Sequence, residues 1–227
     1  MKLRTLTLTV LFAIPLIFFI SCSTGVDDGS SMIAGHLLDQ LWSTPGWNWM
    51  TYSDPADDYF ESFVPYPDIH DILSVSISGD KDGNILTLII EFNEKVIPAI
   101  WSGDPAQLFG YVEIDADRNP STGEPSLIDN QIIYDGLNSP LTGMGVDYIV
   151  SLHDYDGFFQ SVTVYRMDPI ICWDTAGIAH VLYHENTCVL EIPLVVMGDD
   201  DGNIDFGLYI GTEPGATDIT EKYTYTH

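Results

Sequence analysis

Short stretches in which apolar and polar residues alternate, each followed by turn-forming residues, constrain the fold of this chain most strongly. Leu73, Val75 and Ile77 alternate with serines, and a period of two is typical of a β-strand with one buried face. Residues 80–84 supply turn chemistry, and 85–92 follows as the returning strand of a predicted hairpin. Further strands are predicted at 111–114, 131–134, 148–152, 159–167, 178–183, 188–192 and 204–210.

These strands predict an all-β fold, an antiparallel β-sandwich of jelly-roll or immunoglobulin-like type with roughly nine or more strands. A short helix is expected at 32–42, where apolar residues recur at helical spacing. No long amphipathic helix alternates with the strands in the sequence, which argues against a parallel α/β scaffold. We expect residues 32–227 to form a single domain.

The N-terminus has the pattern of a secretory signal peptide. Lys2 and Arg4 precede an apolar run at 6–20, which is short for a bilayer span and contains Pro15. The end of this run, at Ser21 and Cys22, resembles the lipobox of bacterial lipoproteins, in which the cysteine is lipidated. The sequence thus predicts a signal peptide at 1–21, a flexible tether at 22–31 and a lipid anchor in the bacterial cell envelope, at the outer membrane or the cell surface.

Two cysteines remain if Cys22 carries lipid. Cys172 and Cys188 are then available to form a disulfide in an oxidising compartment, which would stabilise the fold by roughly 3 kcal/mol. The alternative is a pair of buried thiols in neighbouring strands. The sequence leaves both interpretations open.

The charge of the chain is strongly negative. Seven Lys and Arg residues stand against 34 Asp and Glu residues, a formal net charge of −27. Such a surface repels phosphate backbones, so nucleic acid is an unfavourable partner. The same surface attracts cations.

One acidic loop has the residue types of a calcium site. Asp115, Asp117 and Asn119 occupy alternate positions just after a predicted strand, and oxygen ligands of this kind suit Ca²⁺. The loop is not an EF-hand, because Pro120 stands at its sixth position and Ser126 at its twelfth. Further ligands must come from elsewhere, and Asp147 is the candidate. An ordinary turn rich in Asp and Asn is the alternative.

Several segments together resemble a group of secreted bacterial sandwich domains. They are 54–58, 71–75, 114–123, 145–149 and 192–194. The chain is similar over roughly residues 50 to 220 to family 9 carbohydrate-binding modules and the DOMON-like superfamily. The resemblance implies a jelly-roll-like sandwich with structural calcium and, for some members, a sugar or haem ligand. It supports Asp115, Asp117, Asn119 and Asp147 as cation ligands and no residue as catalytic.

Aromatic residues are the candidates for contact with sugar. Trp47 and Trp49 place two indoles on one side of an extended segment, and Trp101 lies in a loop-like stretch. Exposed aromatic faces stack on sugar rings, so these three residues are the predicted ligand-binding residues. Packing in the core is the alternative for any single tryptophan.

Sequence motifs for nucleophilic catalysis or phosphate binding are absent. The chain has no Gly-x-Ser-x-Gly, no Gly-x-Gly-x-x-Gly and no phosphate loop. We therefore expect a non-catalytic, lipid-anchored envelope domain with calcium-stabilised loops that binds an extracellular ligand such as carbohydrate. The alternatives are a structural or protein-interaction module of the envelope and, less favoured, an enzyme of the glycoside hydrolase type.

Overall fold

A computed structural model of the chain describes residues 47–55, 67–80, 84–137, 139–168, 172–198, 202–212 and 215–227. The predicted signal peptide, the lipidation site Cys22, the tether and the helix at 32–42 lie outside the described residues. Within the described part, no helix combines the length and the apolar character needed to cross a membrane.

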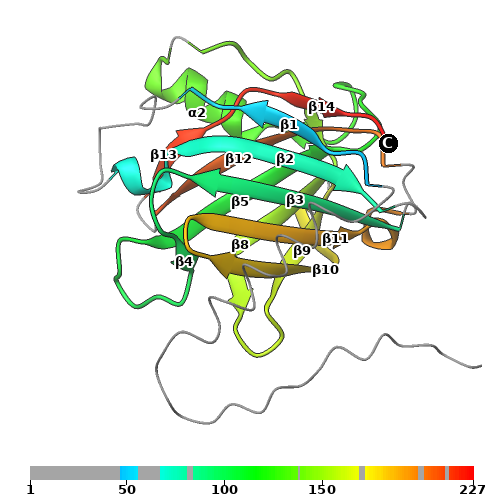
Figure 1. The fold of residues 1–227 in the computed structure, drawn as a ribbon. Coiled ribbons are helices and arrows are strands. Elements are labelled where there is room, and N and C mark those ends of the chain that lie inside the picture. Colours follow the sequence, from blue (N-terminus) through cyan, green and yellow to red (C-terminus); the bar gives the residue numbers. More distant parts are fainter. Residues whose placement is uncertain are drawn as a thin grey trace, which may run out of the picture.

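Most of the described residues lie in strands of one large sheet (Figure 1). Twelve strands form this sheet, namely β1 Met50–Ser53, β2 Ile72–Gly79, β3 Ile85–Phe92, β4 Ile97–Pro98, β5 Gln107–Asp115, β8 Tyr148–Asp156, β9 Ser161–Asp168, β10 Cys172–His184, β11 Thr187–Pro193, β12 Ile204–Thr212, β13 Gly215–Ile219 and β14 Tyr223–Tyr225. A separate two-stranded sheet consists of β6 Glu124–Pro125 and β7 Gly145–Val146. The helical elements are the 3₁₀ helices η1 Pro67–His70 and η2 Leu194–Met197, and the α-helix α2 Leu127–Asp135.

The sheet is all but entirely antiparallel, with the strand order β1-β2-β3-β11-β10-β9-β8-β5-β12-β13. β14 pairs with β12, and β4 pairs in parallel with the start of β5. The sheet curls, so that β1, β2, β3, β11 and β10 form one layer and β9, β8, β5, β12 and β13 lie behind it (Figure 1). The prediction of an all-β, antiparallel sandwich is confirmed.

The apolar side of every long strand faces the space between the two layers. Alternate side chains of a strand point to opposite faces, and burying them removes apolar area from water at about 25 cal/mol per Å². The buried set includes Val75, Ile77, Leu88, Ile90, Val112, Ile114, Val150, Val164, Leu190, Ile192, Leu208 and Ile210. This cluster is the main core.

The two edges of the sheet meet at a seam between β1 and β14. The rings of Tyr52 and Tyr223 stack with their centroids 4.6 Å apart. The Tyr223 hydroxyl donates to Asp54 Oδ1 at 2.8 Å, and the Gly79 amide donates to the Tyr225 hydroxyl at 2.7 Å. Contacts of this kind cover strand edges that would otherwise expose unpaired backbone groups.

The predicted strand at 131–134 is wrong, because these residues belong to α2. Ser126 caps the N-terminus of the helix by accepting from the Asp129 amide at 3.2 Å. Gly136 ends the helix with φ of 63°, a left-handed conformation that glycine adopts without strain. The β-branched and aromatic residues between these caps favoured a strand, but the two caps and the packing of one helix face determine the outcome.

A second, smaller core fixes α2 on the outer face of the back layer. Ile128 and Ile132, one turn apart, are buried against Met144, Val146 and Ile149. The neighbouring Ile133 and Tyr134 point to solvent with exposed fractions of 66% and 84%. The helix therefore covers part of the sheet and leaves one of its sides open.

Of the two interpretations left open for Cys172 and Cys188, the disulfide is not formed, because Cys188 is a free, buried thiol. Cys188 of β11 pairs with Tyr183 near the end of β10, whereas Cys172 is the first residue of β10. Tyr183 lies eleven positions after Cys172 along the extended strand, roughly 35 Å away, and a disulfide requires Cα atoms within about 7 Å. The alternative placed two thiols in neighbouring strands, and β10 and β11 are indeed paired with each other.

Candidate functional site

Strand β5 contributes side chains to three features on the outer face of the back layer. Val112 and Ile114 point into the main core, so the alternation of the strand places Tyr111, Glu113 and Asp115 on the opposite face. These three side chains lie at successive positions about 7 Å apart along the strand. Each belongs to a different local feature, namely an aromatic groove, the anchor of α2 and an acidic cluster.

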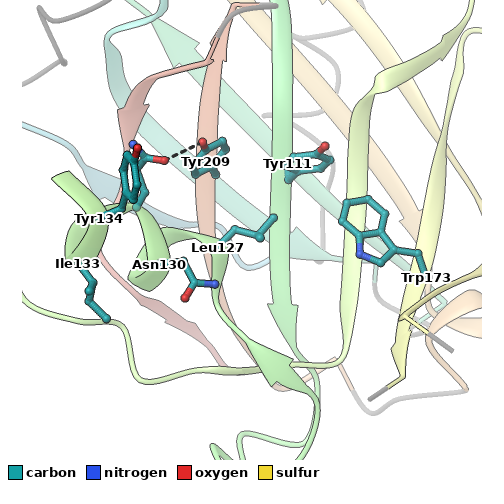
Figure 2. Close-up of a pocket in the computed structure, with 8 residues that line it drawn as sticks. Tyr111, Leu127, Asn130, Ile133, Tyr134, Trp173 and Tyr209 are labelled. Atoms are coloured by element: carbon teal, nitrogen blue, oxygen red, sulfur yellow. Dashed lines mark hydrogen bonds between the residues drawn. The ribbon is translucent and has the colours of Figure 1, made fainter. Parts of the chain in front are cut away.

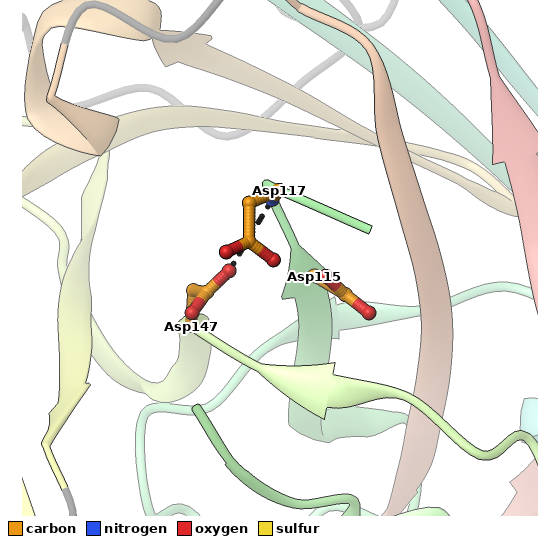
Figure 3. A group of neighbouring side chains, drawn as sticks. All are labelled: Asp115, Asp117 and Asp147. Carbon is orange, nitrogen blue, oxygen red and sulfur yellow. Dashed lines mark hydrogen bonds between the residues drawn. The ribbon is translucent and has the colours of Figure 1, made fainter. Parts of the chain in front are cut away.

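The acidic cluster combines three of the predicted cation ligands. Asp115 lies at the end of β5, Asp117 in the loop that follows, and Asp147 between β7 and β8 (Figure 3). One carboxylate oxygen from each lies within 4.8 Å of the others. Oxygens gathered in this way have the geometry to share one cation.

Backbone amides fix the orientation of these carboxylates. Asp147 Oδ2 accepts from the Ala116 amide at 3.0 Å. Asp115 accepts from the amides of Asn119 and Gly145 through its two oxygens, at 3.1 and 3.2 Å. The cluster is thus built into the backbone of two loops that the sequence separates by some thirty residues.

Close backbone packing holds the two loops together. A Cβ on Gly145 would lie 2.0 Å from the Thr122 carbonyl oxygen, and one on Gly123 would lie 2.4 Å from the Val146 carbonyl oxygen. Neither contact is sterically possible, so both positions require glycine. The short pairing of β6 with β7 depends on this approach.

The charge of the cluster is largely uncompensated. Burial raises the pKa of Asp115 and of Asp147, and the nearby Asp117 carboxylate raises both further. Arg166 partly offsets the effect on Asp147. Arg118 follows Asp117 directly but has φ of 53° and turns away, to within 3.7 Å of Asp205. A bound cation would relieve this repulsion, so the residues present fit a divalent ion with oxygen ligands.

Asn119, the fourth predicted ligand, lies in the same loop but uses its side chain differently. Its Oδ1 accepts from the Ser121 amide at 3.1 Å, the geometry of an Asx turn. Its backbone amide donates to Asp117 at 2.9 Å. In this arrangement Asn119 shapes the loop, and the three aspartates supply the converging oxygens.

The predicted sugar-binding tryptophans belong to two separate groups. Trp47 and Trp49 precede β1 and stack on each other, with ring centroids 5.4 Å apart. Trp101 follows β4, is 59% exposed, and contacts the edge of Phe109 at 4.9 Å. They therefore do not share one local cluster.

An aromatic groove lies between α2 and β10, with a cavity volume of about 620 Å³ (Figure 2). Tyr111 of β5 and Tyr209 of β12 lie between Trp173 on one side and the helix on the other. The lining residues are Tyr111, Leu127, Asn130, Gln131, Ile133, Tyr134, Trp173 and Tyr209. The groove thus combines four aromatic rings with two side-chain amides.

Neighbouring contacts hold the walls of the groove in place. The Tyr209 hydroxyl donates to Gln131 Oε1 at 3.0 Å, which joins β12 to the helix. Trp173 contacts Tyr111 and Tyr165, with ring centroids at 5.4 and 5.3 Å. Trp173 nevertheless keeps 39% of its surface exposed. The side chains that a ligand would contact are therefore held in position before the ligand binds.

Sequence reasoning missed the groove because it placed 131–134 in a strand. Five helix residues, at 127, 130, 131, 133 and 134, line the groove, and their common side appears only at helical periodicity. The signal available in the sequence was Ser126, followed after a helical span by Gly136. Tyr111 and Tyr209 are directly paired across β5 and β12, a register that no local pattern reveals.

Comparison with protein-family models finds no match to this chain, and a search of curated proteins finds no match either.

Proposed function

We propose that this chain is a lipid-anchored domain of the bacterial cell envelope that binds carbohydrate in the aromatic groove. The observation that carries the proposal is the exposed face of Trp173 beside Tyr111, opposite the amides of α2. Aromatic faces carry partial negative charge and attract the C–H groups of a sugar ring. The groove volume of about 620 Å³ lies within the usual range for small-molecule sites.

The polar groups of the groove suit hydroxyl recognition. Asn130 and Gln131 supply amide donors and acceptors on the helix side. Gln131 is already oriented by Tyr209, so part of the cost of ordering it is met before binding. The combination of stacking and oriented amides favours a sugar over a purely apolar ligand.

Calcium is proposed as a structural ion at the acidic cluster. Asp115, Asp117 and Asp147 would hold it, with backbone carbonyls or water completing the six to eight ligands that Ca²⁺ takes. The ion supplies positive charge that neutralises the three carboxylates. Its effect would be to stiffen the loop that leads from β5 to α2, and no chemical step is assigned to it.

Anchoring through Cys22 would place the domain at the outer membrane or the cell surface. The lipobox-like residues and the polar segment at 22–31 support this location. A tethered binding domain can then capture polysaccharide close to the cell.

The test is glycan-array binding by the full-length chain, solubilised in a detergent without a sugar headgroup, in millimolar Ca²⁺. We expect binding that falls at least about tenfold in Trp173→Ala, through loss of the stacking face. Phe158→Ala is the matched control, because Phe158 is 86% exposed and lies outside the groove. Absence of binding to any glycan would refute the proposal.

One observation favours a second candidate function, a protein-interaction module. Phe158 and Phe159 contact each other edge to face, 4.8 Å apart, on the turn between β8 and β9, with 86% and 63% of their surfaces exposed. Adjacent exposed apolar rings are typical of interaction sites. Cross-linking on intact cells should then capture an envelope protein, and replacing both residues by serine should abolish the product without affecting glycan binding.

A further inference from the structure

The aromatic surface continues beyond the groove along the outer face of β5. His153 contacts Tyr111 on one side and Phe109 on the other, with ring centroids at 4.8 and 5.3 Å. Phe109 in turn contacts Trp101 at 4.9 Å. Together with the contact between Tyr111 and Trp173, these residues form an unbroken aromatic stripe, defined as Trp101, Phe109, His153, Tyr111 and Trp173.

Strand register explains why the residues that β5 and β8 contribute to the stripe share one face of the sheet. Phe109 and Tyr111 are two residues apart on β5 and share its outer face. Tyr111 pairs with Ser151 of β8, so His153 lies two residues further along and faces the same side. Phe109 is only 3% exposed, and the Trp101 ring beside it, 59% exposed, presents the surface at that end.

We propose that this stripe binds one extended, uncharged polysaccharide chain, with separate subsites at Trp173 in the groove and at Trp101 on the loop before β5. This inference rests on the proposed carbohydrate-binding function and specifies its ligand class. A single sugar would need only the groove. The exposed indole of Trp101 at the far end of the same stripe offers a second stacking face to a ligand that extends to it.

Charge selects among the possible occupants. Asp154 follows His153 and accepts from the Tyr165 hydroxyl at 2.8 Å, and Asp135 lies at the end of α2 beside Gln131. An acidic polymer would meet these carboxylates on a chain of net charge −27. A second copy of the chain would bring the same acids against each other, so it is disfavoured for the same reason.

Polar groups along the stripe distinguish a glycan from an apolar ligand. His153 is half-buried, and burial lowers its pKa, so its ring is neutral at pH 7 and offers one donor and one acceptor. Asn130 and Gln131 provide amides at the other end. Hydroxyl-rich chains need such partners interleaved with stacking faces.

The test compares disaccharides with hexasaccharides of the cello-, xylo- and manno- series by isothermal titration calorimetry, using the full-length chain in the same detergent. We expect the hexasaccharide of the preferred series to bind at least about tenfold more tightly than its disaccharide. Trp101→Ala should remove this gain in affinity, so that the hexasaccharide binds no more tightly than the disaccharide. Trp173→Ala should weaken the binding of both oligosaccharides, and Phe158→Ala should change the binding of neither.

The outcomes separate the two proposals. If both lengths bind equally and Trp173→Ala weakens both, the extended stripe is wrong and the groove remains a sugar site. If no oligosaccharide of the three series binds, the extended stripe is wrong, and if the glycan array is also negative, the proposed function fails as well. Tighter binding of polygalacturonate, or a dimer in light scattering that Trp101→Ala dissociates, would overturn the choice of occupant. Thermal unfolding of each variant verifies that it is folded.

Discussion

At the scale of single residues, two fully buried groups have strongly shifted pKa values. Burial lowers the pKa of the His70 imidazole to about 4 and raises that of the Glu113 carboxyl to about 7. Glu113 accepts from the Ser126 hydroxyl at 2.5 Å and from the Leu127 amide at 2.6 Å, so it holds the N-terminus of α2 to β5. Both groups link protonation to folding, in opposite directions.

Replacing Glu113 by glutamine should remove one pH dependence of stability. The folded protein keeps this carboxyl protonated up to about pH 7, whereas the unfolded chain ionises it near 4.5. Stability is therefore lost as pH rises between these values, by up to about 3 kcal/mol. Urea unfolding should show that the free energy of unfolding of Glu113→Gln increases relative to that of the wild type between pH 5 and pH 8. If the unfolding free energies of the two proteins changed equally with pH, the raised pKa of Glu113 would be contradicted.

His70 should produce an opposite loss of stability in acid. The unfolded chain binds a proton near pH 6.5, and the folded protein resists it down to about pH 4. Stability contributed by the neutral ring is present above pH 6.5 and falls by up to about 3 kcal/mol towards pH 4. His70→Asn should have a smaller slope of unfolding free energy against pH across this window. An unchanged slope would mean that other groups dominate acid unfolding.

At the scale of elements, the loop from β5 to α2 joins the acidic cluster to the groove. The residues of the acidic cluster were predictable from the sequence, which indicates Asp115 and Asp117 at this loop and Asp147 between β7 and β8 as candidates. The main strands were also predictable, because a period of two is local information. α2 was not, because its caps were outweighed by strand-forming side chains between them, and the groove depends on that helix. The cysteine pairing depended on strand register, which is non-local.

Calcium should raise the thermal stability of the chain through this loop. Binding to the folded state alone adds about 2.7 kcal/mol at a hundredfold excess over the dissociation constant, or roughly 5–10 °C in midpoint. Differential scanning calorimetry in chelator, in millimolar Ca²⁺ and in Mg²⁺ measures the shift. Asp117→Ala should abolish it, and Glu94→Ala, an exposed acid outside the cluster, should not. Without a calcium-specific shift, the loop is a turn only.

At the scale of the whole molecule, basic residues neutralise only a small part of the negative charge. Among the described residues, the two ion pairs both converge on Asp205, from Arg118 at 3.7 Å and Lys222 at 3.0 Å. With seven basic residues in all, most carboxylates have no basic partner of their own. Folding therefore concentrates like charges, and the compact state bears the cost of their repulsion.

Added salt should stabilise the protein even without divalent ions. Raising NaCl from about 0.01 M to about 0.15 M shortens the screening length from about 30 Å to about 8 Å. We expect a gain of about 2 kcal/mol, or about 5 °C, measured by thermal unfolding in chelator. A midpoint that falls with salt would show that attractive pairs dominate instead.

The seam between β1 and β14 has a consequence for biosynthesis. Tyr223, the first residue of β14, packs on Tyr52 of β1, and 170 residues of chain lie between these partners. The curled sheet cannot close until the ribosome has released both. Until β14 has emerged, the edges of both strands stay uncovered, so the chain remains open while all the residues between them are synthesised.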